Sequence, residues 1–241
     1  MLVHGFPLDG RMWRPQASAL ADIRRVLTPH LDGHGRRAGL PAGRTMDEIA
    51  NSLAAWLDEM DVGAVDLGGF SMGGYVAFAF CRLYPDRVRS LALVDSRAAA
   101  DTEAGREGRD KLAAAIGKEG AGAAADAMLP KMFTESIDPA VRDEVAGWMR
   151  EQPPAALVAD VLAMRDRPDS TPTLAGLQVP VLVVHGDQDP IIPIDEAATM
   201  AGATAQGRLV VIAAAAHLSP LEQPEAVNRA LRDHLEASEA T

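Results

Sequence analysis

Residues 69–73 form a G-x-S-x-G motif in which Ser71 stands between two glycines. A short apolar run typical of a strand, 65–67, precedes the motif, and an apolar run typical of a buried helix, 75–83, follows it. A strand, a sharp turn and a helix are the context in which a serine becomes an exposed nucleophile. The glycines allow strand and helix to approach closely. The helix N-terminus offers N–H groups to a developing oxyanion. A glycine-rich turn without chemistry has the same five-residue pattern, so this interpretation depends on the flanking elements.

Two residue types that a serine nucleophile requires follow later strand patterns. The apolar run 179–185 leads into a Gly/Pro-rich loop that contains Asp187 and Asp189, either of which suits a carboxylate that orients a histidine. His217 lies on a loop just past the last strand pattern, 208–213. The order serine, aspartate, histidine predicts a catalytic triad, in which His217 takes the proton of Ser71 and an aspartate holds the imidazole.

The start of the chain predicts the donors that complete such a site. Leu2 and Val3 are strand-like and lead directly into His-Gly-Phe-Pro at 4–7. A glycine after the strand lets the backbone fold close to the serine, so we expect the N–H groups of Phe6 and Met72 to form a two-donor oxyanion hole. Without the serine motif, the same residues would be typical of a β-turn.

Hydrophobic periodicity predicts the elements that must position these residues. Helices are expected at 11–22, 45–61, 195–200 and 224–237, and further strands at 24–29 and 87–94. Thr45 followed by Glu48 three residues later predicts a capping box.

Residues 97–178 lose the alternation of strands and helices, and helical patterns interrupted by prolines replace it. Such a long stretch without a strand exceeds an ordinary connection between strands. We therefore expect a single α/β core made of 1–96 and 179–241, with 97–178 inserted as a helical cap.

Composition excludes several classes of function. Hydrophobic residues make up 48% of the 241 residues, enough for a sizeable core, and the formal net charge is −11. This charge argues against binding to nucleic acid or to anionic lipid. Cys81, the only cysteine, lies in an apolar run and is expected in the core. With no leader or long apolar span in the sequence, a cytoplasmic location is the default expectation. His30 and His34 are expected to be solvated loop residues, with no metal site and no cofactor.

These motifs together resemble those of the α/β-hydrolase-fold serine hydrolases. That group includes small bacterial esterases, 3-oxoadipate enol-lactonase-like enzymes and cofactor-free haloperoxidases, or perhydrolases. The resemblance covers nearly the whole chain and rests on four segments: H-G-F-P-L-D-G at 4–10, G-F-S-M-G-G-Y at 69–75, V-H-G-D-Q-D-P-I-I-P at 184–193 and A-H-L-S-P-L-E-Q-P-E at 216–225. It implies an α/β-hydrolase fold with a mostly parallel sheet flanked by helices. It also implies Asp189 as the triad acid, with Asp95 as a minor alternative, and His217 as the catalytic histidine.

The activity that follows is hydrolysis of carboxylic esters of small or medium substrates through an acyl-enzyme on Ser71. A lactonase is the first alternative. A perhydrolase is the second, because Pro7 resembles a proline that accompanies peracid formation in that branch. A hydrolase-like binding protein without activity is disfavoured by the intact serine, aspartate and histidine. The expected partner is a small-molecule ester or lactone, not nucleic acid or a membrane.

The chain departs from the family pattern in two places. Relatives usually have two strands before the His-Gly pair, whereas three residues precede it here. We therefore expect an apparent lack of the first two strands and an open sheet edge, suited to a homo-oligomer or to a longer N-terminus. Relatives also usually carry aspartate at the position of His30 and arginine at that of Asp32, so the loop at 28–35 is not expected to make its usual polar contacts.

Overall fold

The computed structural model describes residues 1–239, and its centre is a five-stranded sheet in the order β1-β2-β3-β4-β5. Every pair of neighbouring strands is parallel. The strands are β1 (Leu2–Val3), β2 (Val65–Phe70), β3 (Val88–Val94), β4 (Val181–Gly186) and β5 (Gly207–Ile212). The predicted α/β fold with a parallel sheet is confirmed.

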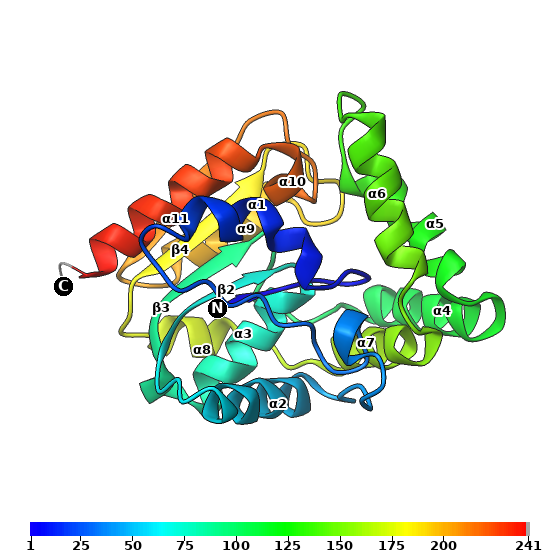
Figure 1. Ribbon diagram of the computed structural model, residues 1–241, viewed down its shortest axis with the longest axis horizontal. Coiled ribbons are helices and arrows are strands. Elements are labelled where there is room, and N and C mark those ends of the chain that lie inside the picture. The colour runs from blue at the N-terminus through cyan, green and yellow to red at the C-terminus, as the bar shows by residue number, and fades with distance from the viewer. Residues whose placement is uncertain (240–241) are drawn as a thin grey trace.

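Helices cover both faces of this sheet (Figure 1). One face carries α1 (Arg14–Leu20) and α11 (Pro224–Glu239), and the other carries α2 (Met46–Glu59), α3 (Met72–Leu83) and α9 (Ile194–Gly202). Side chains alternate along a strand, so Leu182 and Val184 pack in the core of the first face and Val181 and Val183 in that of the second. This two-sided burial explains why β4 is apolar at consecutive positions.

Five helices lie between β3 and β4 in the chain, and all but the last of them project beyond one end of the sheet (Figure 1). The last lies beside α3. They are α4 (Glu103–Glu119), α5 (Ala121–Met132), α6 (Pro139–Arg150), α7 (Pro154–Asp166) and α8 (Thr171–Gly176). Two of the prolines that interrupt this segment, Pro139 and Pro154, stand at the first position of a helix, where proline costs no hydrogen bond. The division of the chain into a core and a cap stays a prediction.

Short elements complete the connections. They are the 3-10 helices η1 (Gly10–Trp13), η2 (Gly35–Arg37) and η3 (Pro85–Arg87), and the short helix α10 (Ser219–Glu222). Thr45 caps α2 by accepting a hydrogen bond from the N–H of Glu48 at 3.1 Å. The Glu48 carboxylate reaches back to the N–H of Arg44 at 2.7 Å, one residue before the position that a capping box would use.

The strand predicted at 24–29 is wrong. These residues, all of them described, have no strand assignment and run beside β1, where the N–H of Leu2 donates to the carbonyl of Leu27 at 2.8 Å. Because β1 is only two residues long, there is little ladder for a neighbouring strand to extend. An assembly through this edge stays a prediction.

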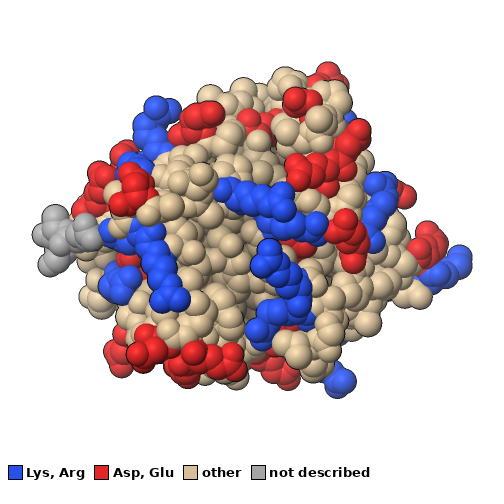
Figure 2. All heavy atoms as spheres, in the orientation of Figure 1, with Lys and Arg blue, Asp and Glu red and all other residues tan. Residues whose placement is uncertain are grey.

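The surface has no single sign of charge in the view of Figure 2, where basic and acidic side chains are interspersed. Acidic side chains form a band along the lower edge, where α2 carries Asp47, Glu48, Asp58 and Glu59. None of the helices described within residues 1–239 is long and apolar enough to cross a membrane.

The contacts of α3 with β2 and with β1 depend on missing side chains. A Cβ added to Gly69 would overlap the carbonyl of Gly73, and one added to Gly73 would overlap the carbonyl of Val3. Gly69→Ala must therefore separate strand and helix, and we expect it to lower the free energy of unfolding by about 2 kcal/mol or more. Gly147→Ala in α6 is the matched control, because a Cβ there meets nothing within 4 Å. It should leave stability equal or raise it by up to about 1 kcal/mol. Denaturant unfolding measures both, and equal effects would contradict the close approach.

Candidate active site

Ser71 occupies the turn between β2 and α3 in a backbone conformation that is rare for residues other than glycine, with φ 49° and ψ −114°. Hydrogen bonds hold this turn from both sides. The N–H of Ser71 donates to the carbonyl of Val94 at 2.9 Å, and the carbonyl of Ser71 accepts from the Oγ of Ser96 at 2.9 Å. Strain of this kind persists where the surroundings enforce it, and it is frequent at functional sites.

The structure brings Ser71, His217 and Asp189 into one chain of hydrogen bonds. The Nε2 of His217 lies 2.9 Å from the Oγ of Ser71, and its Nδ1 lies 2.7 Å from an Oδ of Asp189. The three residues follow β2, β5 and β4, whose carboxyl ends share one edge of the parallel sheet. The imidazole is fully buried and packs against the ring of Phe70, with centroids 5.2 Å apart.

The charge of Asp189 decides which nitrogen of His217 carries the proton. Burial opposes ionisation of Asp189, but the hydrogen bond with His217 and those from the N–H groups of Ile191 and Ile192, at 2.8 and 3.1 Å, outweigh it and lower the pKa of Asp189. An ionised carboxylate only accepts hydrogen bonds. The proton of a neutral His217 therefore sits on Nδ1, and the lone pair of Nε2 faces the hydroxyl of Ser71.

The other two candidate aspartates make different contacts. Asp187 accepts a hydrogen bond from the N–H of Ala215 at 3.3 Å. Asp95 accepts from the N–H of Gly186 at 2.9 Å and from the N–H and Oγ of Ser219 at 3.3 and 2.6 Å. Within residues 1–239 neither aspartate has a hydrogen bond to His217. Asp95 instead joins the start of the loop that carries Asp189 to the loop that carries His217. Burial raises the pKa of Asp95 well above its usual range.

The two predicted oxyanion donors flank Ser71. Met72 is the first residue of α3, and Phe6 follows Gly5, where an added Cβ would lie 2.8 Å from the carbonyl oxygen of Phe70. The Phe6 turn therefore lies against the end of β2. Among the described residues, the backbone N–H groups of Phe6 and Met72 have no hydrogen-bond acceptor in the protein. The structure thus leaves both donors free, and their role stays a prediction.

His4 fastens the turn that presents Phe6. Burial lowers the pKa of His4 to about 3, so the ring is neutral and has one donor and one acceptor nitrogen. Its Nε2 accepts from the N–H of Leu31 at 3.0 Å, and its Nδ1 therefore donates to the carbonyl of Gly5 at 3.2 Å. The ring links the Phe6 turn to the loop that follows residue 28.

The prediction that His30 and His34 are solvated loop residues is wrong. His34 is fully buried, with its Nε2 2.9 Å from an Oδ of Asp160 in α7, and the His30 side chain is only 15% exposed. Asp160 lies 126 positions along the chain from His34, so no local pattern around His34 could reveal the pair. Asp32, at the second unusual position of this loop, accepts from the Nε of Arg37 at 2.6 Å and from the Oγ of Ser52.

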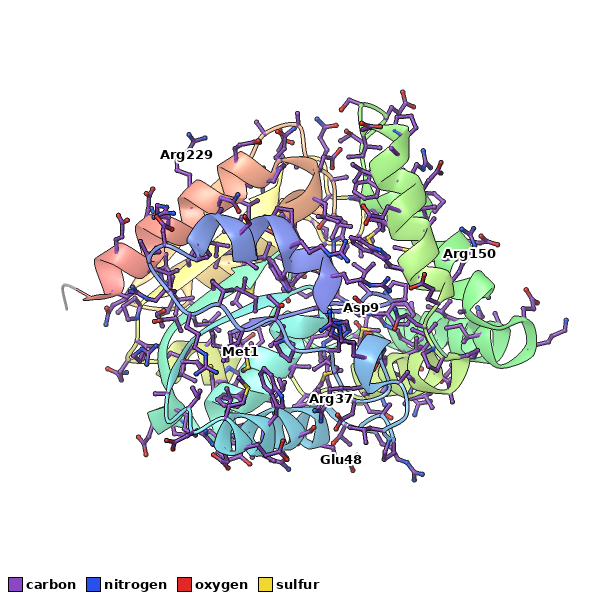
Figure 3. The ribbon with its side chains drawn as sticks, viewed as in Figure 1. Met1, Asp9, Arg37, Glu48, Arg150 and Arg229 are labelled. Carbon is purple, nitrogen blue, oxygen red and sulfur yellow. The ribbon has the colours of Figure 1, made fainter. Side chains whose placement is uncertain are left out.

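Asp9, like Asp95, joins separate loops through hydrogen bonds, and the sequence analysis did not identify it. Its buried carboxylate accepts from the backbone N–H of Arg11 at 2.9 Å and from the side-chain amide of Gln152 at 2.9 Å. The side-chain Oε1 of Gln152 in turn accepts from the N–H of Gly35 at 3.1 Å. Figure 3 shows Asp9 between η1 and the short helix η2. One polar group thus connects the first loop, the loop around η2 and the end of α6.

Asp95, His185 and Asp189 place potential metal-ligand atoms within 4.8 Å of one another. The oxygens of both aspartates already accept the hydrogen bonds given above, and the Nε2 of His185 lies 2.9 Å from the carbonyl of Ile192. The group is therefore best described as a hydrogen-bonded support for the loops of Asp189 and His217.

Comparison with known proteins shows the family of the chain. The profile of the alpha/beta hydrolase fold matches residues 1–224. The chain belongs to this family. A thermophilic esterase from Thermogutta terrifontis, solved with malate bound, is 41% identical with a TM-score of 0.94, and the match covers 98% of this chain and 89% of that one. The enol-lactonase from Burkholderia xenovorans LB400 is 28% identical with a TM-score of 0.90, covering 98% and 90%.

A third relative is larger than this α/β hydrolase. The dihydrolipoyllysine-residue acetyltransferase component of the acetoin cleaving system of Pseudomonas putida is 32% identical over 237 residues, which is 95% of this chain and 61% of that protein. The chain therefore spans about three fifths of the length of this relative. The resemblance to the esterase and enol-lactonase group is confirmed.

The buried pair of His34 and Asp160 predicts a pH-dependent stability. Burial opposes protonation of His34, but Asp160 outweighs it and raises the pKa of His34 above its ordinary value. A raised pKa in the folded state stabilises the fold below the unfolded value of about 6.5, and this contribution is lost as the pH rises through the folded value. We expect Asp160→Asn to cost about 3 kcal/mol at pH 6 and progressively less at higher pH.

Asp166→Asn is the matched control for this prediction. Asp166 is on the same helix, but its pairs with Arg106 and Arg165 are exposed. Its loss should cost about 0.5 kcal/mol or less, with no trend between about pH 6 and 9. Unfolding in denaturant at several pH values measures both variants. A cost for Asp160→Asn that stays constant with pH would contradict a protonated His34.

Proposed function

We propose that this α/β hydrolase cleaves carboxylic esters of small or medium substrates through an acyl-enzyme on Ser71. The observation that carries the proposal is the hydrogen-bond chain from the Ser71 hydroxyl through His217 to Asp189, at 2.9 and 2.7 Å, with the basic lone pair directed at the hydroxyl. The similarity to the Thermogutta esterase, at 41% identity over 98% of the chain, supports an ester as the substrate.

In the acylation half-reaction, the Oγ of Ser71 attacks the ester carbonyl carbon while its proton moves to the Nε2 of His217. The imidazolium that forms is stabilised by Asp189. The carbonyl oxygen becomes an oxyanion, and the free N–H groups of Phe6 and Met72 would each stabilise it by about 3 kcal/mol. When the carbon–oxygen bond to the alcohol breaks, His217 returns the proton from Nε2 to the leaving alcohol.

Deacylation repeats these steps with water. His217 removes a proton from a water molecule, whose oxygen attacks the acyl carbon, and the bond to the Ser71 Oγ breaks. The proton on Nε2 then returns to Ser71, and the carboxylic acid leaves. Because serine and histidine exchange one proton in both halves, they act as a unit, and losing either should cost about as much as losing both.

A series of p-nitrophenyl esters, from acetyl to long-chain, tests this proposal. We expect Ser71→Ala and His217→Ala each to lower kcat by about 10⁴-fold or more. The acyl series should also give the preferred chain length. Unaltered turnover in Ser71→Ala would exclude the serine mechanism.

Two variants in one loop test whether Asp189 or Asp187 is the acid of the triad. Asp189→Asn removes the charge that stabilises the imidazolium and disturbs the tautomer, so kcat should fall by about 10³-fold or more. Asp187→Asn keeps an oxygen that can accept a hydrogen bond from the N–H of Ala215, so we expect its kcat to stay within about twofold of the wild-type value. A twofold change corresponds to well under 1.4 kcal/mol in the activation free energy. Steady-state kinetics with one ester decides between them, and a larger loss in the Asp187 variant would assign the acid to that residue.

A lactone is the second candidate substrate, because the Burkholderia enol-lactonase shares the fold at 28% identity over 98% of this chain. Ring opening and linear ester cleavage use the same residues, so the two activities differ in the shape of the substrate alone. The ratio of kcat/KM for a five-membered lactone to that for a linear ester of equal carbon number separates them. The perhydrolase alternative depends on Pro7 and stays a prediction.

A further inference from the structure

Three arginines converge on one buried carboxylate beside the site described above. Asp101 pairs with Arg97, with the Nε of Arg109 in α4 at 3.1 Å, and with the guanidinium of Arg167 after α7 at 2.9 Å. The Asp101 side chain is 1% exposed and that of Arg167 is 2% exposed.

Arg167 also donates hydrogen bonds to two backbone carbonyls, that of Met164 at 2.7 Å and that of Ala99 at 2.9 Å. These bonds fix its guanidinium in place, so its position does not depend on Asp101 alone. Arg97 and Arg109 are less enclosed, with side chains that are 23% and 21% exposed. The cluster of Arg97, Asp101, Arg109 and Arg167 thus has one rigid member and two members that border solvent.

The positive charges of this cluster exceed the negative ones. Burial opposes ionisation of Asp101, but Arg167 and Arg109 outweigh it and lower the pKa of Asp101 to about 2, so the carboxylate is charged at neutral pH. Glu196 of α9 acts on Arg97 through space, yet within residues 1–239 it forms no ion pair with any of the three arginines. Three arginines against two carboxylates leave at least one positive charge uncompensated.

Two donors of the cluster are also unused. The Nε atoms of Arg97 and Arg167 are buried and have no hydrogen-bond partner among the described residues. A buried charged donor without an acceptor is costly, and such a group in a folded protein calls for a ligand or an ordered solvent molecule. An anionic oxygen bound here would therefore compensate the excess positive charge and also accept hydrogen bonds from the unpaired donors.

The cluster adjoins the turn that carries Ser71. The guanidinium of Arg167 lies over the ring of Tyr75, 4.0 Å from its centroid, and Tyr75 stands in the first turn of α3, four residues after the serine. Arg97 directly follows Ser96, whose Oγ donates to the carbonyl of Ser71. A positively charged group thus lies close to the turn that carries Ser71.

We propose that Arg97, Arg109 and Arg167 form a binding site for a carboxylate. The planar guanidinium group suits a carboxylate because two parallel N–H donors match its two oxygens. The carboxylate has two possible sources, a second carboxylate on the ester substrate or a separate free carboxylate such as a product. The first source rests on the proposed ester hydrolysis, whereas the second does not.

The first experiment compares two esters of equal chain length, mono-p-nitrophenyl glutarate, with a free carboxylate, and p-nitrophenyl pentanoate, which is neutral. If the substrate supplies the carboxylate, kcat/KM of the wild type should favour the charged ester by about tenfold, which corresponds to about 1.4 kcal/mol. Arg97→Gln and Arg109→Gln should each remove most of that preference. Arg106→Gln, in α4 one turn before Arg109 and exposed in its pair with Asp166, is the matched control and should keep it.

The second experiment measures binding of free glutarate to Ser71→Ala by calorimetry. Binding that weakens about tenfold in the Arg97 and Arg109 variants, without a preference for the charged ester, assigns the site to a free carboxylate. Failure of the ester-hydrolysis proposal would appear separately, as turnover of the neutral ester that survives Ser71→Ala. The site would be overturned if the folded wild-type protein showed no preference for the charged ester and the folded Ser71→Ala protein bound no glutarate.

Discussion

The strained backbone of Ser71 is the constraint on which the rest of the site depends. A residue with a side chain holds a positive φ there because β2 and α3 nearly touch on either side of it, and only a glycine at 69 permits that contact. Gly73 in turn lets α3 approach the end of β1. The bonds from Ser71 to Val94 and from Ser96 tie the turn to β3. Each support is backbone or a small side chain, so the position of the hydroxyl follows from the sheet and not from flexible groups. The loops that carry Asp189 and His217 then need only to place these side chains next to a hydroxyl whose position is already fixed.

Two buried histidines show how the surroundings set charge near this point. His4 and His34 lie with ring centroids 5.3 Å apart and both are fully buried. Burial lowers the pKa of His4, and the positive charge of His34 lowers it further, against the smaller opposing effects of the hydrogen bond to Gly5 and of Asp9. For His34, Asp160 outweighs burial and raises the pKa. A neutral His4 can accept the N–H of Leu31, so a carboxylate on α7 indirectly supports the turn that presents Phe6.

The features that could be predicted from the sequence are those with a local signal. The serine turn has two glycines and two apolar flanks within twenty residues, and the β4 loop has a Gly/Pro pattern, so their places in the fold could be predicted. The segment 24–29 also has a local strand pattern, but it forms no strand. Its neighbour β1 is only two residues long and offers too few backbone groups for pairing. His34 and Asp101 were missed for a different reason. The partner of His34 lies on a distant helix, and Arg167, the most buried partner of Asp101, lies 66 positions along the chain. Periodicity carries no information about which distant charges meet.

The overall charge of the protein and the charge of the arginine cluster have opposite signs, and this difference decides how an anion would be recognised. A net charge of −11 repels a carboxylate approaching from solvent. At physiological ionic strength that repulsion is screened beyond about 8 Å, so it slows encounter more than it weakens a bound state. Inside the cluster the oxygens would leave water and meet oriented guanidinium groups, where electrostatic interactions are stronger because screening is weaker. A neutral molecule of the same shape would leave the Nε donors of Arg97 and Arg167 unpaired. Selectivity for an anion therefore arises from contacts at the cluster, and it does not require that the protein surface attract anions.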